Sequence, residues 1–403
     1  MNKQILVVSQ YFYPENFRIN NICDEWVKRG YKLTVVTGIP NYPRGRFFKG
    51  FGYFKKRSEY LNGIRIIRLP IIPRGRKPIT LMLNYLSFVV SGWIWKTFTK
   101  VKADLVFNFE VSPMTQALPA VWFAKRKKIP CFVYVQDLWP ENVEIVGGIK
   151  NRRLLAFIGK IVDYIYKRTS LILVTSESFK RSIIKRGVSE DKVVFWPQYA
   201  EDFFKPYDKE TVESKKFNVM FTGNIGDAQG LDILPKLALI LKENNLSDNI
   251  IFTLVGDGRN KENLIKLIAS LNLNKMFVFE SQKKPEEIPN YLSKADVAFV
   301  SFAENDLFRM TIPAKLQTYL ACGKPILAVA SGETERIINE AGCGLTSVPG
   351  NVEDAYKNLI FLFEMNNEEI KKMGNNALVY SQKNFNKKTL MDQMDSIILR
   401  EVK

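Results

Sequence analysis

Residues 4–36, QILVVSQYFYPENFRINNICDEWVKRGYKLTVV, contain the three elements that decide the fold. The apolar run at 5–9 is short and uninterrupted, as expected of a strand buried on both faces. Residues 19–29 have the pattern of a helix that Gly30 ends, and a second strand-like run follows at 33–37. A strand, a helix and a strand in this order predict the start of a parallel sheet.

The same alternation continues along the chain and then begins again. Further strand-like runs occur at 64–68, 104–108, 130–135 and 171–175, and a second series occurs at 217–221, 251–255, 277–279, 297–300 and 325–329. Strands that alternate with helices form parallel sheets covered on both faces. We therefore predict an α/β chain of two facing Rossmann-like domains, at 1–200 and 201–378, with the helical residues 379–403 packing back on the first domain.

Composition excludes several classes of site. The 403 residues include no histidine, which removes Ser-His-Asp and Cys-His catalysis and histidine-ligated zinc. Four cysteines lie far apart, without the paired spacing of a metal site. Lys3 leads directly into the first strand, so we expect no secretory leader and a cytoplasmic location.

The excess of basic over acidic residues lies entirely in the first half of the chain. Residues 1–200 contain 34 Lys and Arg against 13 Asp and Glu, whereas the rest contain 25 against 28. A basic half beside a near-neutral one indicates an anionic partner. No nucleic-acid-binding signature accompanies this charge, so we expect an anionic membrane surface and no nucleic acid.

The segment 78–95 has no charged residue and many apolar ones, with basic residues before it (Arg74, Arg76, Lys77) and after it (Lys96, Lys100). It is close to the roughly 20 residues that a membrane-spanning helix needs. Three interpretations stay open: a helix buried against the first sheet, a helix lying in the membrane interface, and a transmembrane span.

Parallel α/β sheets bind ligands beyond the carboxyl ends of their strands, and three loops follow predicted strands. The first, at 11–18, precedes a helix whose free amides favour an anion. The second, at 222–230, contains three glycines that let the backbone approach a phosphate. In the third, a helix starting near Pro313 would direct its amides at a diphosphate, with Arg309 and Lys315 to neutralise it.

The stretch from Pro313 to Pro325 resembles the P-S-K … Y-L-A-x-G-K-P signature of family 4 glycosyltransferases, which have the GT-B fold. Matching motifs follow one another in order along the chain: SQYFYPE at 9–15, TGIPNYP at 37–43, DLWPE at 137–141, TGNIG at 222–226, VGDG at 255–258 and EAGCGL at 340–345. The motifs of the first half are most similar to bacterial surface-polysaccharide enzymes of the N-acetylfucosaminyltransferase kind.

The resemblance implies retaining transfer from a nucleotide sugar, usually UDP-linked, without a required metal or other cofactor. The second domain would bind the donor and the first domain the acceptor. The implied residues are Asp137, Arg309 and Lys315 for catalysis; Gly223, Asn224, Gly226, Gln229, Ser281, Gln282, Lys283, Met310 and Thr318 for the donor; and Glu15, Asn16, Arg18 and Tyr42 for the acceptor.

The chain departs from the family pattern at three positions. Met310 and Thr318 stand where many members have two glutamates eight positions apart, and Gln229 stands where a lysine is frequent. Asp137 follows a strand where a catalytic or acceptor-orienting carboxylate is expected, although it is also a candidate N-cap before Pro140.

The resulting hypothesis is transfer of a sugar, such as N-acetyl-L-fucosamine, from its UDP carrier to a polyprenyl-diphosphate-linked saccharide. The enzyme would work on the cytoplasmic face of the cell membrane in surface polysaccharide synthesis. The alternatives are a non-catalytic subunit that binds sugar nucleotides in an assembly complex, and a UDP-sugar epimerase or phosphorylase of GT-B layout.

Overall fold

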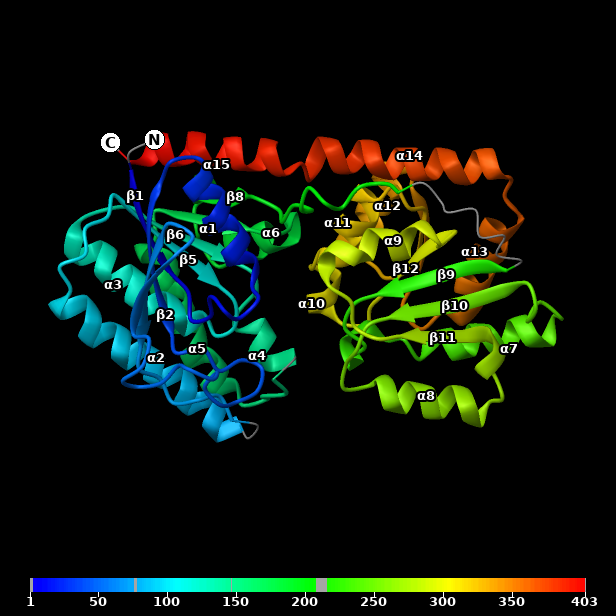
Figure 1. Cartoon of the computed structure of the whole chain (residues 1–403), viewed down its shortest axis with the longest axis horizontal. Coiled ribbons are helices and arrows are strands. Elements are labelled where there is room, and N and C mark those ends of the chain that lie inside the picture. Colours follow the sequence, from blue (N-terminus) through cyan, green and yellow to red (C-terminus); the bar gives the residue numbers. More distant parts are fainter. Residues whose placement is uncertain (1–2, 76–77, 146, 208–215, 403) are drawn as a thin grey trace. The chain divides into compact units, whose positions relative to one another are not determined.

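The computed structural model describes residues 3–75, 78–145, 147–207 and 216–402. Arg76 and Lys77, which precede the apolar segment, lie outside this range. The chain divides into two compact units (Figure 1). The first consists of Met1–Thr175, Phe179–Trp196 and Met394–Lys403, and the second of Ser176–Ser178 and Pro197–Gln393.

The first unit contains one eight-stranded sheet of order β3-β4-β2-β1-β5-β6-β7-β8. Every neighbouring pair is parallel except β3 and β4. Strands β1, β5, β6 and β7 are almost wholly buried, as their uninterrupted apolar sequences predicted. The strands are β1 (Gln4–Val8), β2 (Lys32–Gly38), β3 (Ser58–Leu61), β4 (Ile64–Leu69), β5 (Leu105–Glu110), β6 (Cys131–Val135), β7 (Leu171–Val174) and β8 (Val193–Phe195).

Helices cover the first sheet. Helix α1 packs against β2, while α3 packs against β5 and lies between α2 and α5. The helices are α1 (Arg18–Lys28), α2 (Pro78–Phe98), α3 (Ala117–Lys127), α4 (Glu141–Ile145), α5 (Arg152–Arg168) and α6 (Glu177–Lys185).

The second unit contains a six-stranded parallel sheet of order β11-β10-β9-β12-β13-β14. Its strands are β9 (Phe217–Thr222), β10 (Ile250–Val255), β11 (Phe277–Glu280), β12 (Val297–Ser301), β13 (Ile326–Val329) and β14 (Gly344–Ser347). Its helices are α7 (Ile233–Glu243), α8 (Lys261–Ser270), α9 (Ile288–Ser293), α10 (Asp306–Arg309), α11 (Ala314–Ala321), α12 (Glu333–Ala341), α13 (Val352–Glu364) and α14 (Asn367–Asn384). Two parallel sheets with helical layers confirm the predicted α/β class.

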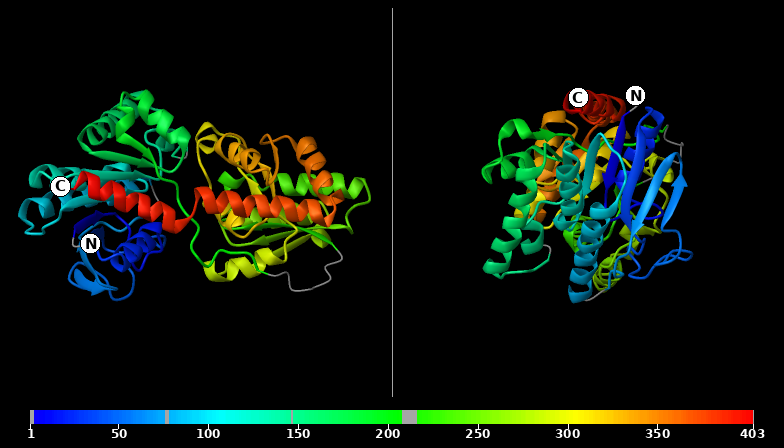
Figure 2. Two further views of the ribbon diagram at one scale, coloured as in Figure 1. Left: turned by 90° about the horizontal axis from the view of Figure 1, so that it is seen from above. Right: turned by 90° about the vertical axis from the view of Figure 1, so that its left-hand side faces the viewer.

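The last helix, α15 (Lys387–Glu401), ends on the first unit. The return to this unit begins at Met394 rather than at residue 379, because residues 379–393 belong to the second unit. Asp395 accepts hydrogen bonds from Arg29 at 2.7 Å and from the Tyr31 hydroxyl at 2.9 Å. Lys3 Nζ donates to the carbonyl of Val402 at 3.3 Å, so the two ends of the chain lie side by side (Figure 2).

Helix α2 has its polar side chains turned toward the protein. Asn84 is fully buried, accepts from Gln10 Nε2 at 2.8 Å and donates to the carbonyl of Ile72. Ser91 donates to the carbonyl of Pro70, and Gly92 lies so close to α3 that a Cβ would be 2.3 Å from Pro119 Cγ. Phe88 is also fully buried, but eight other apolar side chains are exposed by 38–78%: Ile79, Met82, Leu83, Leu86, Val90, Trp93, Ile94 and Phe98. We call these eight residues the α2 stripe.

One face of helix α2 packs on the first unit, as the first interpretation expected, and the other face is apolar and exposed. Among the described residues, no helix has the length and hydropathy that crossing a membrane requires.

Candidate functional site

In both sheets the strand order changes sides beside the first strand. The strands that follow β1 lie on one side of it until β5, which lies on the other side, and β12 likewise lies on the other side of β9. Ligands of open α/β sheets bind beyond the carboxyl ends of the strands at such points. In the second unit, the loop that follows β9 contains Gly223, helix α10 contains Arg309, and helix α11 contains Lys315.

The loop after β9 lies backbone to backbone on the loop after β10. Gly223 N donates to Val255 O at 2.9 Å, and Ile225 N donates to Asp257 O at 2.8 Å. A Cβ on Gly256 would lie 1.9 Å from Gly223 O, so no side chain fits there. This contact explains why the motifs TGNIG and VGDG occur together, and it leaves the backbone at Gly223 and Asn224 exposed.

Lys315, in the first turn of α11, has a buried ammonium group. Its Nζ lies 3.7 Å from the centroid of the Phe221 ring and has no hydrogen-bond partner among the described residues. A Cβ on Gly223 would lie 3.7 Å from this Nζ. Desolvation lowers the pKa of Lys315 to about 7. A buried cation without a partner, beside a glycine loop and a helix start, forms a site for an anion.

The helix that holds Lys315 is tied to the end of β9. The Tyr319 hydroxyl is buried and accepts from Thr222 N at 2.8 Å. Residue Gln317, also in α11, donates to the carbonyl of Gln198 at 2.8 Å. The sequence motif contained Tyr319, but it gave no indication that this hydroxyl fixes the distance between α11 and the glycine loop.

The other predicted donor residues differ in exposure and in partners. Arg309 is exposed and pairs with Glu304 at 3.4 Å. The Gln229 side chain accepts from Gly226 N at 3.1 Å and so closes its own loop. Thr318 donates to the carbonyl of Ala314 within the helix, while Met310 is half-buried.

The loop that follows β11 contains the residues expected at the base of the nucleotide. Ser281 and Gln282 are exposed. Lys283 pairs with Glu280 at 3.2 Å, and its Nζ lies 5.0 Å from the centroid of the Tyr291 ring.

In the first unit, Asp137 follows β6 and is half-buried. One carboxylate oxygen accepts from both the backbone N and the hydroxyl of Ser112 at 2.8 Å. The carboxyl of Glu110, at the end of β5, is fully buried nearby, and desolvation raises its pKa well above the ordinary value. Ser112, in the segment that follows β5, thus holds the Asp137 carboxylate at this edge of the sheet.

The acceptor residues predicted in the first unit fall into two sets. Asn16 is exposed, and Arg18 and Tyr42 are half-buried. Glu15 is buried, and its carboxylate accepts from Asn41 N at 2.7 Å and from Tyr42 N at 2.6 Å. In this position Glu15 holds the 41–42 loop in place.

Replacing Glu15 with glutamine tests this arrangement. Burial raises the pKa of Glu15 to about 7, so folding favours the protonated carboxyl. The stability of the wild type should therefore fall as the pH rises from the unfolded pKa of about 4.5 toward 7. Glu15→Gln keeps the acceptor oxygen without the charge, so it should unfold at a higher temperature than the wild type at about pH 8, by an amount corresponding to roughly 2–3 kcal/mol.

At about pH 4.5 the two midpoints should coincide. Glu144→Gln, which changes an exposed carboxyl of α4, serves as the control and should match the wild type at both pH values. A Glu15→Gln protein that is less stable than the wild type at the higher pH would contradict the assignment.

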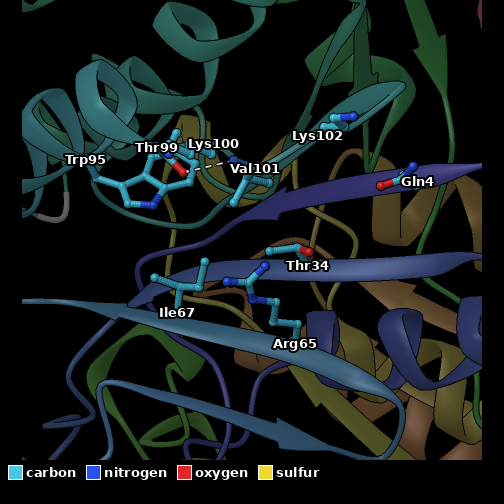
Figure 3. Close-up of a pocket in the computed structure, with 9 residues that line it drawn as sticks. All are labelled: Gln4, Thr34, Arg65, Ile67, Trp95, Thr99, Lys100, Val101 and Lys102. Atoms are coloured by element: carbon cyan, nitrogen blue, oxygen red, sulfur yellow. Dashed lines mark hydrogen bonds between the residues drawn. The ribbon is translucent and has the colours of Figure 1, made fainter.

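A cavity of about 530 Å³ opens in the first unit beside the C-terminal end of α2. Figure 3 shows Trp95 and Thr99 on one side of the cavity and Lys102 on the side across from them. Arg65, from β4, lies below. Arg65, Lys100 and Lys102 line it, and its described lining includes no carboxylate. The cavity lies near the beginning of β1, away from the carboxyl ends where Asp137 lies.

Comparison with known proteins assigns both regions. The family described as glycosyl transferase 4-like domain matches residues 16–198, and the family described as glycosyl transferases group 1 matches residues 204–379. The chain is 23% identical over 354 residues to the putative colanic acid biosynthesis glycosyl transferase WcaI of Escherichia coli, covering 82% of this chain and 84% of that protein.

Solved structures with this fold include sucrose-phosphate synthase from Thermosynechococcus elongatus, with a TM-score of 0.73, 15% identity and coverage of 99% and 98% of the two chains. HepE of Anabaena in complex with UDP has a TM-score of 0.71, 14% identity and coverage of 98% and 100%. The chain is therefore a glycosyltransferase of GT-B fold, built from a glycosyl transferase 4-like domain followed by a group 1 glycosyl transferase domain.

Proposed function

We propose that this enzyme transfers a sugar, with retention of configuration, from a UDP-sugar to a polyprenyl-diphosphate-linked saccharide in surface polysaccharide synthesis. We further propose an N-acetylated deoxy sugar, such as N-acetyl-L-fucosamine, as the transferred group. The observation that carries the proposal is the buried ammonium of Lys315, which has no partner among the described residues and lies against Gly223.

A nucleotide diphosphate fits the chemistry of the second unit. Negative charge builds on the leaving diphosphate during transfer, and preorganised cations stabilise it most effectively in a site that excludes water. Lys315 supplies a buried cation, Arg309 supplies an exposed one, and the backbone at Gly223 can approach a phosphate closely. These groups would stabilise the leaving diphosphate without a metal ion. The HepE structure, which has the same fold, was solved with UDP.

Retention suits the residues of this enzyme. Attack from the same face as the departing diphosphate lets a phosphate oxygen take the acceptor proton, so a histidine base is not needed. Asp137 would orient the acceptor hydroxyl. The name of the Escherichia coli relative, which refers to colanic acid biosynthesis, supports a saccharide acceptor of a surface polysaccharide.

The surface of the first unit favours binding of the enzyme to the anionic cytoplasmic face of a membrane. The α2 stripe exposes apolar side chains where a water-facing helix would have polar ones. Lys100 and Lys102 line the cavity at its C-terminal end. Apolar groups beside cations match a bilayer with anionic headgroups.

The test is a panel of UDP-sugars assayed for UDP release, with and without a polyprenyl-diphosphate-linked saccharide in liposomes. Acceptor-dependent release from one donor is the expected result. Conversion of the UDP-sugar without an acceptor would favour an epimerase. UDP binding by calorimetry without any product would favour a sugar-nucleotide-binding subunit. Failure to turn over any donor in the panel would contradict the proposal.

Asp137→Asn should lower kcat by about 100-fold, because it keeps the hydrogen bonds from Ser112 but removes the negative charge. The affinity for UDP, measured by calorimetry, should not change. Asp163→Asn, which changes an exposed carboxylate paired with Arg186, is the matched control. Full activity of Asp137→Asn would leave Asp137 with a structural role only.

A further inference from the structure

The first unit contains an arginine whose charge no carboxylate of the described residues neutralises. The Arg74 guanidinium lies 5.1 Å from the centroid of the Tyr42 ring and donates to the Tyr11 hydroxyl at 3.4 Å. Its charged and titratable neighbours are the phenols of Tyr11, Tyr42 and Tyr85. Burial raises the pKa of Tyr11 and of Tyr85, so both are neutral.

Arg68, a nearby arginine with a structural role, provides a comparison for Arg74. Arg68 has a side chain only 1% exposed, pairs with Glu59 at 2.5 Å and donates to the carbonyl of Tyr13 at 3.0 Å. Arg74 is only partly buried and has no salt bridge among the described residues. Its cationic group is therefore available to an anion from outside the chain.

The backbone fixes Arg74 in this position. Its N–H donates to Asn41 Oδ1 at 2.7 Å, and Asn41 N in turn donates to the buried carboxylate of Glu15. Gly45 has a φ of 70°, and a Cβ there would lie 2.3 Å from Arg74 O. A guanidinium that is stacked on a ring and held by its backbone loses little freedom when it binds an anion.

Arg74 lies near both the acceptor-side carboxylate of Asp137 and helix α2. Tyr85 interacts electrostatically with both Arg74 and Asp137, which places the three side chains in one neighbourhood. Tyr85 belongs to α2, whose exposed stripe begins at Ile79. This part of the unit therefore contains a carboxylate suited to a sugar hydroxyl, a cation, and a helix with an exposed apolar surface.

We propose that Arg74, stacked on Tyr42, binds the phosphate group that joins the acceptor saccharide to its lipid carrier. A lipid-linked acceptor contains a saccharide, a diphosphate and an apolar chain, and Asp137, Arg74 and the α2 stripe match these three parts in their chemistry. This inference rests on the proposed function, because it concerns the acceptor of the same reaction. Guanidinium groups bind phosphate oxygens through two parallel N–H donors, which the stacked position of Arg74 leaves open.

The test uses the full chain saturated with UDP, so that the donor site is filled, and titrates inorganic pyrophosphate and farnesyl diphosphate in a calorimeter. Arg74→Gln should weaken both affinities by about 10- to 100-fold, the usual effect of losing hydrogen bonds to a charged group. Arg74→Lys keeps the charge without the paired donors, so its affinities should lie between those of the wild type and of Arg74→Gln. Tighter binding of farnesyl diphosphate than of pyrophosphate identifies the lipid-linked ligand; equal binding would contradict that part of the proposal.

Arg44→Gln is the matched control, since Arg44 is exposed and its guanidinium carbon lies 5.8 Å from the centroid of the Phe48 ring. It should bind both probes as the wild type does. Unchanged affinity in Arg74→Gln, or no binding of either probe to the UDP-saturated wild type, would overturn the inference. The affinity of each protein for UDP is measured by calorimetry before it is saturated. A failure to bind UDP is therefore seen separately from a loss of probe binding in Arg74→Gln.

Discussion

Lys315→Met is expected to lower kcat/KM for the sugar donor by about 100- to 1000-fold, the range found when one preorganised stabilising group is removed from an active site. The same substitution should leave the midpoint of thermal unfolding unchanged or raise it. The wild-type ammonium is buried against Phe221 without a hydrogen-bond partner among the described residues, so its charge destabilises the unliganded fold. Methionine fills a similar volume without that charge.

The pH dependence of UDP binding gives a second measurement. Desolvation lowers the pKa of Lys315 to about 7 in the free protein, and a bound diphosphate should raise it again. Below that pH the lysine is already charged and affinity is highest. Above it, binding must take up a proton, so affinity should fall by up to about tenfold for each pH unit. Calorimetry in buffers of different ionisation enthalpy measures this proton uptake directly.

Lys236→Met serves as the control, because Lys236 is exposed and pairs with Asp232 on the surface of α7. It should bind UDP and turn over as the wild type does. Lys315→Met should also lose the proton uptake near pH 8, which separates Lys315 from the titration of UDP itself. If Lys315→Met bound UDP with wild-type affinity, the ammonium would not be the diphosphate ligand.

The fold could be predicted because its strands are continuous apolar runs between helical segments. Strands β1, β5 and β6 are buried on both faces, and such strands have the clearest sequence signal. The sequence did not predict β3, β8 and β14, which have only three or four residues each and are partly exposed. Each of them pairs with one neighbouring strand at an edge or end of its sheet, which a short sequence does not reveal.

The candidate site could be located from motifs, but the roles of its side chains depend on three-dimensional neighbours. Glu15 accepts from amides 26 and 27 positions away, and no local pattern indicates such a contact. Arg74 lies in a basic stretch that sequence analysis assigned to the flank of an apolar segment. Its stacking on Tyr42 depends on the loop that follows β2. Burial of the Lys315 ammonium likewise depends on packing against Phe221 from another element.

Helix α2 illustrates a different limit. Its sequence combines apolar residues with Asn84, Ser87 and Ser91, and hydropathy alone does not say which set faces the protein. The structure turns the polar set inward, because the carbonyls of Pro70 and Ile72 and the amide of Gln10 need partners there. An outward apolar face is the reverse of a water-facing helix.

The second large effect concerns that face. The wild-type enzyme should float with liposomes that contain phosphatidylglycerol, and Leu86→Ser/Trp93→Ser should lower its partition into them by about 10- to 100-fold. Leu86 and Trp93 are 54% and 52% exposed in the α2 stripe. Moving an exposed apolar side chain of this size out of water contributes about 1.5–3 kcal/mol when it is fully buried, and an interfacial position realises part of that amount. Trp95 is left intact because it is half-buried and its ring stacks on Phe123, with 5.3 Å between the ring centroids.

Phe361→Ser/Val379→Ser is the matched control, because both side chains are exposed, by 55% and 63%, on helices of the second unit. It removes a comparable apolar area and should float as the wild type does. Equal flotation of the control and of Leu86→Ser/Trp93→Ser, or failure of the wild type to bind these liposomes, would contradict membrane docking through α2.

The cations of the cavity beside α2 should contribute a separate, salt-dependent part of the same binding. Lys100→Gln/Lys102→Gln removes two of them and should weaken binding to phosphatidylglycerol liposomes by about 1 kcal/mol for each charge at low salt. The loss should shrink as salt is added, because screening already weakens the wild type. Binding to neutral phosphatidylcholine liposomes should not change. The apolar substitutions in the stripe should instead lower binding to both kinds of liposome at every salt concentration, so the two surfaces can be told apart by their response to salt.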